Sequence, residues 1–336
     1  LYWTGYTAGT SHGQKLLDYM LEAGANTAVI DLKMDNGQLA FMPNDESLQV
    51  YVMDSPAIQD LDALLLQLGE LEIYRIARIP VMRDGAFAAV NPRLALKTAS
   101  GNFWQDNIGS IWVDPASHEV WNYAIDLARE AYDRGFDEVQ FDYVRFASDG
   151  AISRIIYPVY DGVLGKEAVM QEFFKTVGGT MQKEGIPVSF DLFGMTFWSE
   201  DDFNIGQRLL DVYPYADYVS PMVYPSHYPN GFKGFGNPAV FPYEIVKMSL
   251  DEGAVMMVRD ATEEVIVDEV VEVVLPSPEE EKEIRTHFRP WIQDFDIGAV
   301  YTSDLIKAQI QASRDAGASG WLLWNARNVY EPTDYR

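Results

Sequence analysis

Aspartates stand at the ends of several segments whose residues alternate in the way that strands do. In FDEVQFDYVRF, residues 136–146, Asp142 falls on one face, whereas Val139, Phe141 and Tyr143 fall on the other. A carboxylate at the end of a buried strand is either a catalytic candidate or a structural ion-pair partner. This segment alone does not decide between the two.

The same alternation places further acids at three other strand ends: Asp31 in TAVIDLKMD, Asp191 in PVSFDLFG and Asp294 in RPWIQDF. Asp31 shares its face with Lys33, and Asp294 shares its face with Ile292. Glycoside hydrolysis uses such a cluster, because one carboxylic acid protonates the leaving oxygen while a second carboxylate attacks the anomeric carbon or activates water. The alternative is that each acid caps a loop or pairs with a base; the candidate bases are Lys33, Arg78, Arg145 and Arg327.

Eight strand-and-helix units can be laid out along the chain. The expected strands are residues 3–7, 27–32, 73–81, 136–146, 186–194, 217–228, 289–295 and 318–325. The expected helices are 11–23, 57–68, 118–134, 166–184, 204–213, one that begins near Pro242, and 302–316. This alternation predicts a single (β/α)8 TIM barrel over residues 1–336 with long βα loops. Because the C-terminal strand ends of such a barrel carry the chemistry, we expect the four acids to share one rim.

Two segments depart from the repeating pattern. Residues 261–285, between the sixth and seventh strands, are acidic and rich in Val, so we expect an insertion whose apolar runs pair as a projecting hairpin. It lacks EF-hand spacing, which favours a solvated charged face over a Ca²⁺ site. The other segment, residues 84–115, is a long loop that holds Phe103, Trp104 and Trp112. A loop of this length that carries aromatic residues favours a functional role.

Polar and aromatic residues follow other predicted strand ends. Tyr224 and His227 come after the sixth strand, and Trp324 ends the eighth. Each can hydrogen-bond or stack on a sugar ring, although His227 is equally compatible with a plain loop residue and Trp324 with a plug of the barrel. The expected substrate-binding set is Asp31, Lys33, Arg78, Arg145, Tyr224, His227, Asp294 and Trp324.

Composition excludes several function classes. The chain has 336 residues with 51 acidic and 25 basic side chains, and its net charge of −26 argues against binding to nucleic acid or to anionic membranes. No apolar run approaches the roughly 20 residues of a membrane span. With 4 histidines and no HExxH, a catalytic zinc site is not expected. GxSxG and the glycine-rich phosphate motifs are absent too, so we expect no metal and no cofactor, and the oligomeric state stays open.

Eight motifs between Gly5 and Asn325 carry a family resemblance: GYTAG, AVIDLKMDNG, RIARIPVMRD, GFDEVQFDYVRF, SFDLFG, DYVSPMVYPSHY, RPWIQDF and GWLLWN. With these the chain resembles the glycoside hydrolase TIM-barrel domain family of bacteria and archaea, long known only as a domain of unknown function. One small departure is Ala147 in FASDG, where a proline is expected. The resemblance implies a carbohydrate-active barrel similar in layout to the alpha-amylase and alpha-galactosidase superfamilies.

In those superfamilies an Asp that ends the fourth strand is the nucleophile, and Asp142 matches that position. The acid/base of alpha-amylase-like enzymes is a Glu that ends the fifth strand, where this sequence has Asp191; that of alpha-galactosidase-like enzymes is an Asp that ends the sixth, where SPMVYPSHY has no acid. We therefore expect an extracellular or cell-surface glycoside hydrolase that cleaves an α-linked poly- or oligosaccharide, by a retaining mechanism with Asp142 as nucleophile and Asp191 as acid/base.

Two other functions remain open for the same residues. One is a non-catalytic carbohydrate-binding or cell-wall-associated barrel whose acids only hydrogen-bond sugars. The other is metal-dependent hydrolysis by the Asp cluster. The distance between the carboxylates separates the first from catalysis, since catalytic pairs lie about 5 Å apart in retaining enzymes and roughly 6.5–9.5 Å apart in inverting ones.

Overall fold

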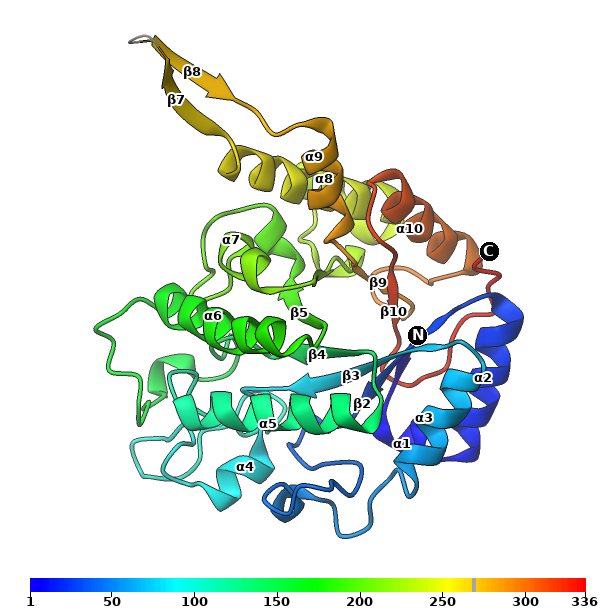
Figure 1. Cartoon of the computed structure of the whole chain (residues 1–336), viewed down its shortest axis with the longest axis vertical. Helices are drawn as coiled ribbons and strands as arrows, with labels where there is room; N and C mark the ends of the chain where they lie inside the picture. Colours follow the sequence, from blue (N-terminus) through cyan, green and yellow to red (C-terminus); the bar gives the residue numbers. More distant parts are fainter. Residues whose placement is uncertain (268–269) are drawn as a thin grey trace.

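Eight parallel strands form the centre of the molecule in the computed structural model, which describes residues 1–267 and 270–336 (Figure 1). Their order in the sheet is β1, β2, β3, β4, β5, β6, β9 and β10. Their bounds are β1 Tyr2–Trp3, β2 Thr27–Asp31, β3 Tyr74–Pro80, β4 Glu138–Asp142, β5 Val188–Phe193, β6 Tyr218–Met222, β9 Trp291–Gln293 and β10 Leu322–Trp324. The predicted (β/α)8 TIM barrel is confirmed.

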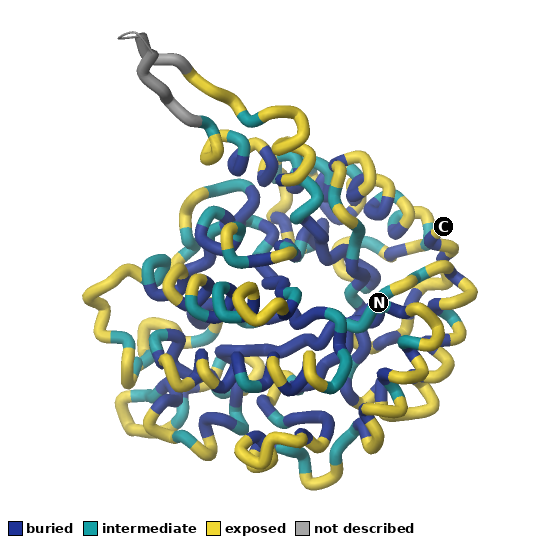
Figure 2. Tube along the Cα trace, viewed as in Figure 1, coloured by how far each residue is buried: buried dark blue, intermediate teal, exposed yellow. Residues whose placement is uncertain are grey.

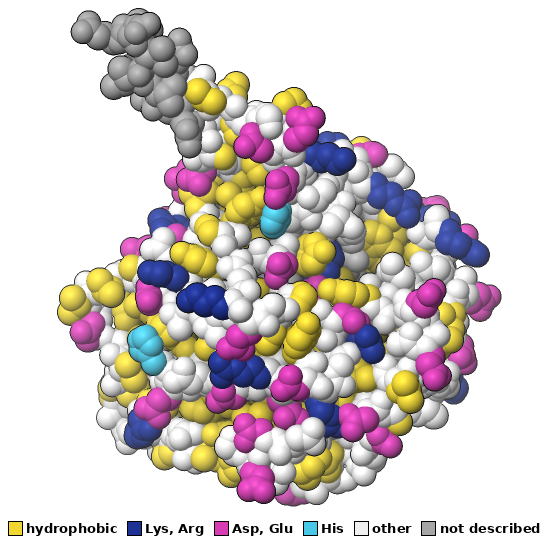
Figure 3. Space-filling view, in the orientation of Figure 1, with side chains coloured by type: hydrophobic (Ala, Val, Ile, Leu, Met, Phe, Trp, Pro, Cys, Tyr) yellow, Lys and Arg dark blue, Asp and Glu magenta, His cyan; other side chains and the backbone are white. Residues whose placement is uncertain are grey.

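Helices cover the outside of the barrel, so that the strands are buried and the outer faces of the helices are exposed (Figure 2). Their bounds are α1 Gly5–Ala8, α2 Ser11–Ala23, α3 Leu61–Glu70, α4 Gly85–Val90, α5 His118–Arg134, α6 Lys166–Glu184, α7 Leu209–Val212, α8 Pro242–Asp260, α9 Pro278–Thr286 and α10 Ser303–Asp315. Asp and Glu side chains are scattered among Lys and Arg over the face seen in Figure 3. No described helix is both long enough and apolar enough to span a membrane.

One predicted helix is wrong. Residues 204–213 contribute only the four-residue α7. Asp202 accepts hydrogen bonds from the backbone N–H groups of Asn204 and Gly206, each at 3.0 Å. Phe203 and Asn204 have φ angles of 52° and 56°, which no right-handed helix contains. The aspartate thus holds a loop in place of the first helical turn.

β1 and β10 are the two edges of the sheet, and the segment after β10 bridges them. The Asn328 side chain donates to the Tyr2 carbonyl at 2.9 Å and accepts from the Thr4 backbone N–H at 2.7 Å. The Tyr330 hydroxyl donates to the same carbonyl at 2.5 Å. The Tyr2 ring also stacks on Trp324 of β10 with centroids 4.0 Å apart. These contacts close the barrel.

The barrel interior combines a small apolar cluster with polar side chains. The apolar cluster consists of Tyr2, Val29, Ile76, Tyr224, Trp291 and Leu322, and it is separate from the large core between strands and helices. Deeper polar residues hydrogen-bond to one another: Gln140 donates to Ser220 at 3.2 Å, and Ser189 donates to Glu138 at 2.5 Å. Buried polar side chains of this kind are stable only where they are hydrogen-bonded.

The acidic segment between β6 and β9 forms the predicted hairpin. β7 Glu263–Val267 pairs antiparallel with β8 Val270–Val274, and the pair projects away from the barrel (Figure 1). Residues 268–269 of the predicted 261–285 insertion, and the side chains of 263–272, lie outside the described part of the structure. The chain then enters α9 through a capping box formed by Ser277 and Glu280.

Candidate active site

Arg78 of β3 lies at the centre of the polar interior, with only 1% of its surface exposed. Its Nη1 donates to Asp31 Oδ1 at 2.6 Å, and its Nη2 donates to Asp142 Oδ2 at 2.5 Å. The other oxygen of Asp31 accepts from the Tyr2 hydroxyl at 2.5 Å. Burial lowers the pKa of Arg78, but the charges of Asp31 and Asp142 act against it, and the pKa lies well above the ordinary value. One permanently charged guanidinium thus fixes carboxylates from β2 and β4.

Asp142 ends β4, and the backbone turns sharply after it. Tyr143 has a φ of 50°, a left-handed conformation that costs a residue with a Cβ on the order of 1–3 kcal/mol. This turn brings the Tyr143 backbone N–H to Asp142 Oδ1 at 2.5 Å, so both carboxylate oxygens accept hydrogen bonds. The predicted grouping of Tyr143 with Val139 and Phe141 is wrong, because the strand alternation stops at Asp142 and the Tyr143 side chain lines the cavity instead.

Asp191 of β5 faces the same guanidinium and is 1% exposed. Its Oδ2 lies 4.0 Å from Arg78 Nε, and its Oδ1 accepts the indole N–H of Trp291 at 2.7 Å. Burial, with the charge of Asp142 added to it, holds the pKa of Asp191 well above its usual range, against the opposing effects of Arg78 and Trp291. A carboxyl group whose pKa is raised, beside a second carboxylate that accepts hydrogen bonds on both oxygens, is an arrangement suited to an acid and a nucleophile.

Six of the predicted site residues line a single cavity of about 190 Å³ with four further side chains. The predicted six are Arg78, Asp142, Arg145, Asp191, Tyr224 and Trp324; the other four are Tyr143, Phe193, Met222 and Trp291. Asp142, Phe193, Met222 and Trp324 are the last residues of β4, β5, β6 and β10. The cavity therefore lies at the C-terminal end of the barrel, where TIM-barrel active sites are built.

Two predicted site residues, Asp31 and Lys33, do not line the cavity. Asp31 is 2% exposed and bonds to Arg78 and Tyr2, and burial raises its pKa to about 6. Lys33 is 1% exposed and pairs with Asp84, whose carboxylate caps α4 through the Phe87 N–H at 2.7 Å. Asp31 holds the arginine, whereas Lys33 fixes the start of a loop helix.

Two others lie farther from the acid pair. His227 is exposed and packs its ring edge-on against Tyr224 at 5.1 Å. Asp294 follows β9 and accepts the backbone N–H of Glu331 at 3.0 Å, and burial raises its pKa to about 7. Trp291 and Gln293 take the inner face of β9, so Asp294, which shares a face with Ile292, is directed away from the cavity.

Sequence reasoning missed four cavity residues: Tyr143, Phe193, Met222 and Trp291. Trp291 carried a usable signal, since alternation put it opposite the apolar Ile292, but an apolar ring on an inner face gives no sign of a hydrogen bond to an acid. Tyr143 carried no such signal, because its position depends on a positive φ, and no glycine or asparagine stands there to indicate one.

The long loop at residues 84–115 packs against two residues of the cavity without lining it. It contains α4, and both Trp104 and Trp112 are buried. Trp112 packs edge-on against Tyr143 at 5.8 Å, and the Arg145 guanidinium lies over its ring at 4.9 Å. Since Tyr143 and Arg145 line the cavity, this loop helps to position two of its residues.

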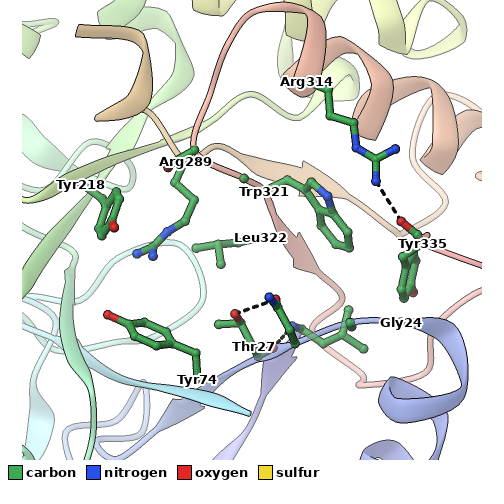
Figure 4. A pocket seen from close by; sticks show the side chains of 14 residues that line it. Gly24, Thr27, Tyr74, Tyr218, Arg289, Arg314, Trp321, Leu322 and Tyr335 are labelled. Atoms are coloured by element: carbon green, nitrogen blue, oxygen red, sulfur yellow. Dashed lines mark hydrogen bonds between the residues drawn. The ribbon is translucent and has the colours of Figure 1, made fainter. Parts of the chain in front are cut away.

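A larger cavity, of about 450 Å³, lies at the opposite end of the barrel and is drawn in Figure 4. It is lined at the strand starts by Thr27, Tyr74, Tyr218 and Leu322, and Arg289 points between Tyr74 and Tyr218. Buried Glu138 pairs with Arg289 and neutralises its charge. The N-terminal end of a TIM barrel usually serves stability, so cavity size does not locate the active site here.

The acid cluster is not arranged as a metal site. Within residues 1–267 and 270–336, no group of three or more acidic or histidine side chains can hold an ion. Arg78 occupies the place between Asp31, Asp142 and Asp191 that a cation would need. This donor set therefore gives no support to metal-dependent hydrolysis by the Asp cluster.

Comparison with known proteins gives one family. A family model described as "Putative glycosyl hydrolase domain" matches residues 1–330. A search of curated proteins finds no match to the sequence.

Solved structures resemble the chain over most of its length. The PgaB (BpsB) glycoside hydrolase domain from Bordetella bronchiseptica has a TM-score of 0.62 at 12% identity, over 98% of this chain and 94% of that one. The spore cortex-lytic enzyme SleL from Bacillus megaterium has a TM-score of 0.52 at 12% identity, over 99% and 71% of the two chains. A hypothetical protein from Ruminiclostridium thermocellum is 28% identical over 61% of this chain and 98% of that one, with a TM-score of 0.49. At 12% identity the first two similarities show a shared fold.

Proposed function

Because the chain belongs to the family described as putative glycosyl hydrolase domains, a class that hydrolyses glycosidic bonds, we propose that it cleaves an α-linked poly- or oligosaccharide with retention of configuration. One observation carries the proposal: Asp142 and Asp191 both face Arg78 Nε at the end of the barrel, and only Asp142 is in hydrogen-bond contact with it, while burial raises the pKa of Asp191.

The spacing of the two acids is compatible with catalysis. Arg78 Nε is 3.2 Å from Asp142 Oδ2 and 4.0 Å from Asp191 Oδ2, so these two oxygens are at most about 7 Å apart. Catalytic carboxylates lie about 5 Å apart in retaining enzymes and roughly 6.5–9.5 Å apart in inverting ones. A limit of about 7 Å includes the retaining distance and also the lower end of the inverting range, and it is the resemblance of Asp142 to a fourth-strand nucleophile that favours retention.

In the proposed first step, Asp142 attacks the anomeric carbon while Asp191 protonates the departing glycosidic oxygen. Oδ1 of Asp191 accepts the Trp291 indole, so Oδ2 is the oxygen that carries the proton. The sugar is then esterified to Asp142 and the leaving group departs as an alcohol. In the second step Asp191, now ionised, takes a proton from water as the water oxygen attacks the anomeric carbon and releases Asp142.

Aromatic rings that line the cavity would contact the sugar. Trp324 is partly exposed and stacks on Tyr2, Tyr224 is buried, and Arg78 lies over the Trp324 ring at 5.1 Å. Flat apolar faces of this kind pack against sugar rings, while polar edges bind the hydroxyl groups. A polysaccharide cannot cross a membrane unaided, so we also propose that the domain works outside the cell or at its surface.

The test begins with a panel of α- and β-linked polysaccharides, followed by NMR of the first anomer released. Release of the α-anomer from an α-linked substrate is the expected result. Asp142→Ala should abolish turnover, and azide should restore it by producing the β-glycosyl azide, because azide enters from the face that the carboxylate leaves. Full activity of the Asp142→Ala variant would overturn the nucleophile, whereas sugar binding without turnover by the native chain would favour a non-catalytic barrel.

A further inference from the structure

The Arg145 guanidinium lines the cavity and has no acidic partner. Its Nη1 donates to the Phe146 carbonyl at 3.1 Å and to the Ser148 hydroxyl at 3.0 Å. Among the described residues, no carboxylate lies within 4.0 Å of it, and neither Nε nor Nη2 donates a hydrogen bond. Those two nitrogens are not sealed from solvent. The outer edge of the guanidinium therefore stays available to a ligand.

Three aromatic rings hold this guanidinium in place. It lies 4.7 Å from the centre of the Phe193 ring, 4.9 Å from that of Trp112 and 5.5 Å from that of Tyr143. Tyr143 is itself fixed, since its hydroxyl accepts from Arg83 at 2.6 Å. Rings attract the face of a guanidinium and leave the N–H groups along its edge unused. Arg145 is thus orientated without being neutralised.

An arginine in this state is costly unless something pairs with it. Only 8% of its surface is exposed, and burial lowers its pKa from the ordinary value. The other arginine of the cavity, Arg78, is matched by Asp31 and Asp142. The charges of Asp142 and Asp149 act on Arg145 from a distance and oppose the lowering of its pKa, but among the described residues neither carboxylate pairs with it within 4.0 Å. A buried charge normally has a partner.

We propose that Arg145 binds the carboxylate of an acidic sugar, so that the substrate is a uronic acid or another carboxylated glycoside. This inference rests on the proposed hydrolysis at Asp142 and Asp191. Nε and Nη2 lie side by side in one plane and match the two oxygens of a carboxylate. The cavity, at about 190 Å³, is below the roughly 300–1,000 Å³ of drug-sized pockets and suits a single sugar ring next to the acids.

The experiment compares matched aryl α-glycosides that differ only at C6: glucoside with glucuronide, and galactoside with galacturonide. We expect kcat/KM to be higher for at least one uronide than for its neutral partner by on the order of 10- to 100-fold, the range of a charge-assisted hydrogen-bonded pair. Arg145→Gln should lower that ratio by the same factor, and Arg145→Lys by less, because lysine keeps the charge but loses the planar fork.

Three controls separate an effect on substrate specificity from a loss of folding or a general effect of removing an arginine. Arg93→Gln removes an exposed arginine that pairs with Glu119 outside the cavity, and it should keep both rates. Melting curves of all variants show whether the fold is retained. A 6-O-sulfated galactoside serves as a second anion, and a preference for it over the uronide would overturn the carboxylate assignment.

Binding supplies a readout that does not depend on turnover. Calorimetry with Asp142→Asn should show tighter binding of glucuronate or galacturonate than of the neutral sugars, and Arg145→Gln in that background should remove the difference. Equal binding of acidic and neutral sugars would overturn the Arg145 inference even if hydrolysis is found. Absence of all hydrolysis, together with selective binding of the acid, would overturn the proposed function alone.

Discussion

Trp291 donates its indole N–H to Oδ1 of Asp191 at 2.7 Å, joining β9 to β5 inside the barrel. The bond has two consequences for the acid. It fixes the orientation of the carboxyl group, and it acts against the burial that raises the pKa of Asp191. Trp291 is therefore a positioning residue for the proposed proton donor.

Trp291→Phe removes this bond but keeps an aromatic ring. We expect kcat to fall by about 10- to 100-fold, because a small misplacement of a catalytic group has effects of that size. The pKa of Asp191 should rise further once the indole is gone, since a hydrogen bond to the ionised form lowers a carboxyl pKa. Loss of activity at high pH, where Asp191 ionises, should then begin at a higher pH than in the native enzyme. A pH profile that only falls in height would show that the bond has no effect on this ionisation.

Asp191→Asn tests proton donation directly and can keep the bond to Trp291 through its amide oxygen. General acid catalysis contributes roughly 10²–10⁴-fold, so kcat/KM should drop by that factor on substrates with a poor leaving group. A 2,4-dinitrophenyl glycoside needs no protonation and should lose far less. Rates on a series of aryl glycosides of different leaving-group pKa measure this contrast, and an equal loss across the series would count against Asp191 as the acid.

Arg78→Met should destabilise the fold by about 3–5 kcal/mol, because it leaves the buried carboxylates of Asp31 and Asp142 without their cation. The pKa of Asp31 is already raised to about 6 by burial, and loss of the arginine should raise it more. Protonation then relieves the unpaired charge, so urea unfolding should show a smaller loss at pH 5 than at pH 8. Asp31→Asn added to Arg78→Met should recover part of the stability at pH 8. If the losses of unfolding free energy of the two single variants simply add in the double variant, Asp31 and Arg78 do not form a shared ion pair.

Asp294→Asn separates a structural acid from the catalytic ones. The pKa of Asp294 is raised to about 7, so the folded chain holds its proton more tightly than the unfolded chain does. Its contribution to stability is complete below the ordinary value of 3.8 and is lost as the pH rises through 7. The asparagine should raise the unfolding free energy at pH 8 by on the order of 1 kcal/mol, with little change near pH 4. Hydrolysis should continue, because Asp294 does not line the cavity. Loss of activity in the Asp294→Asn variant would show that Asp294 takes part in catalysis or substrate binding.

Local features of the sequence predicted local structure well. α2, α5 and α6 have the predicted limits, because amphipathic spacing and a following Gly24, Gly135 or Gly185 in the left-handed conformation define a helix within its own residues. The helix predicted at 204–213 failed for the complementary reason. There the Asp202 side chain competes for backbone N–H groups, and residue propensity does not reveal which contact is more stable.

The sequence by itself determined the order of the eight strands, most of the helices between them, and the inner face on which Asp31, Asp142 and Asp191 lie, because a period of two or 3.6 residues is a property of neighbouring positions. Only the tertiary structure decided which acids meet. Asp142 and Asp191 share Arg78 because parallel strands set their ends side by side, whereas Asp294 belongs to the other face of its strand. Distances across the barrel depend on strand register and on closure, and both arise from contacts between residues far apart in the chain.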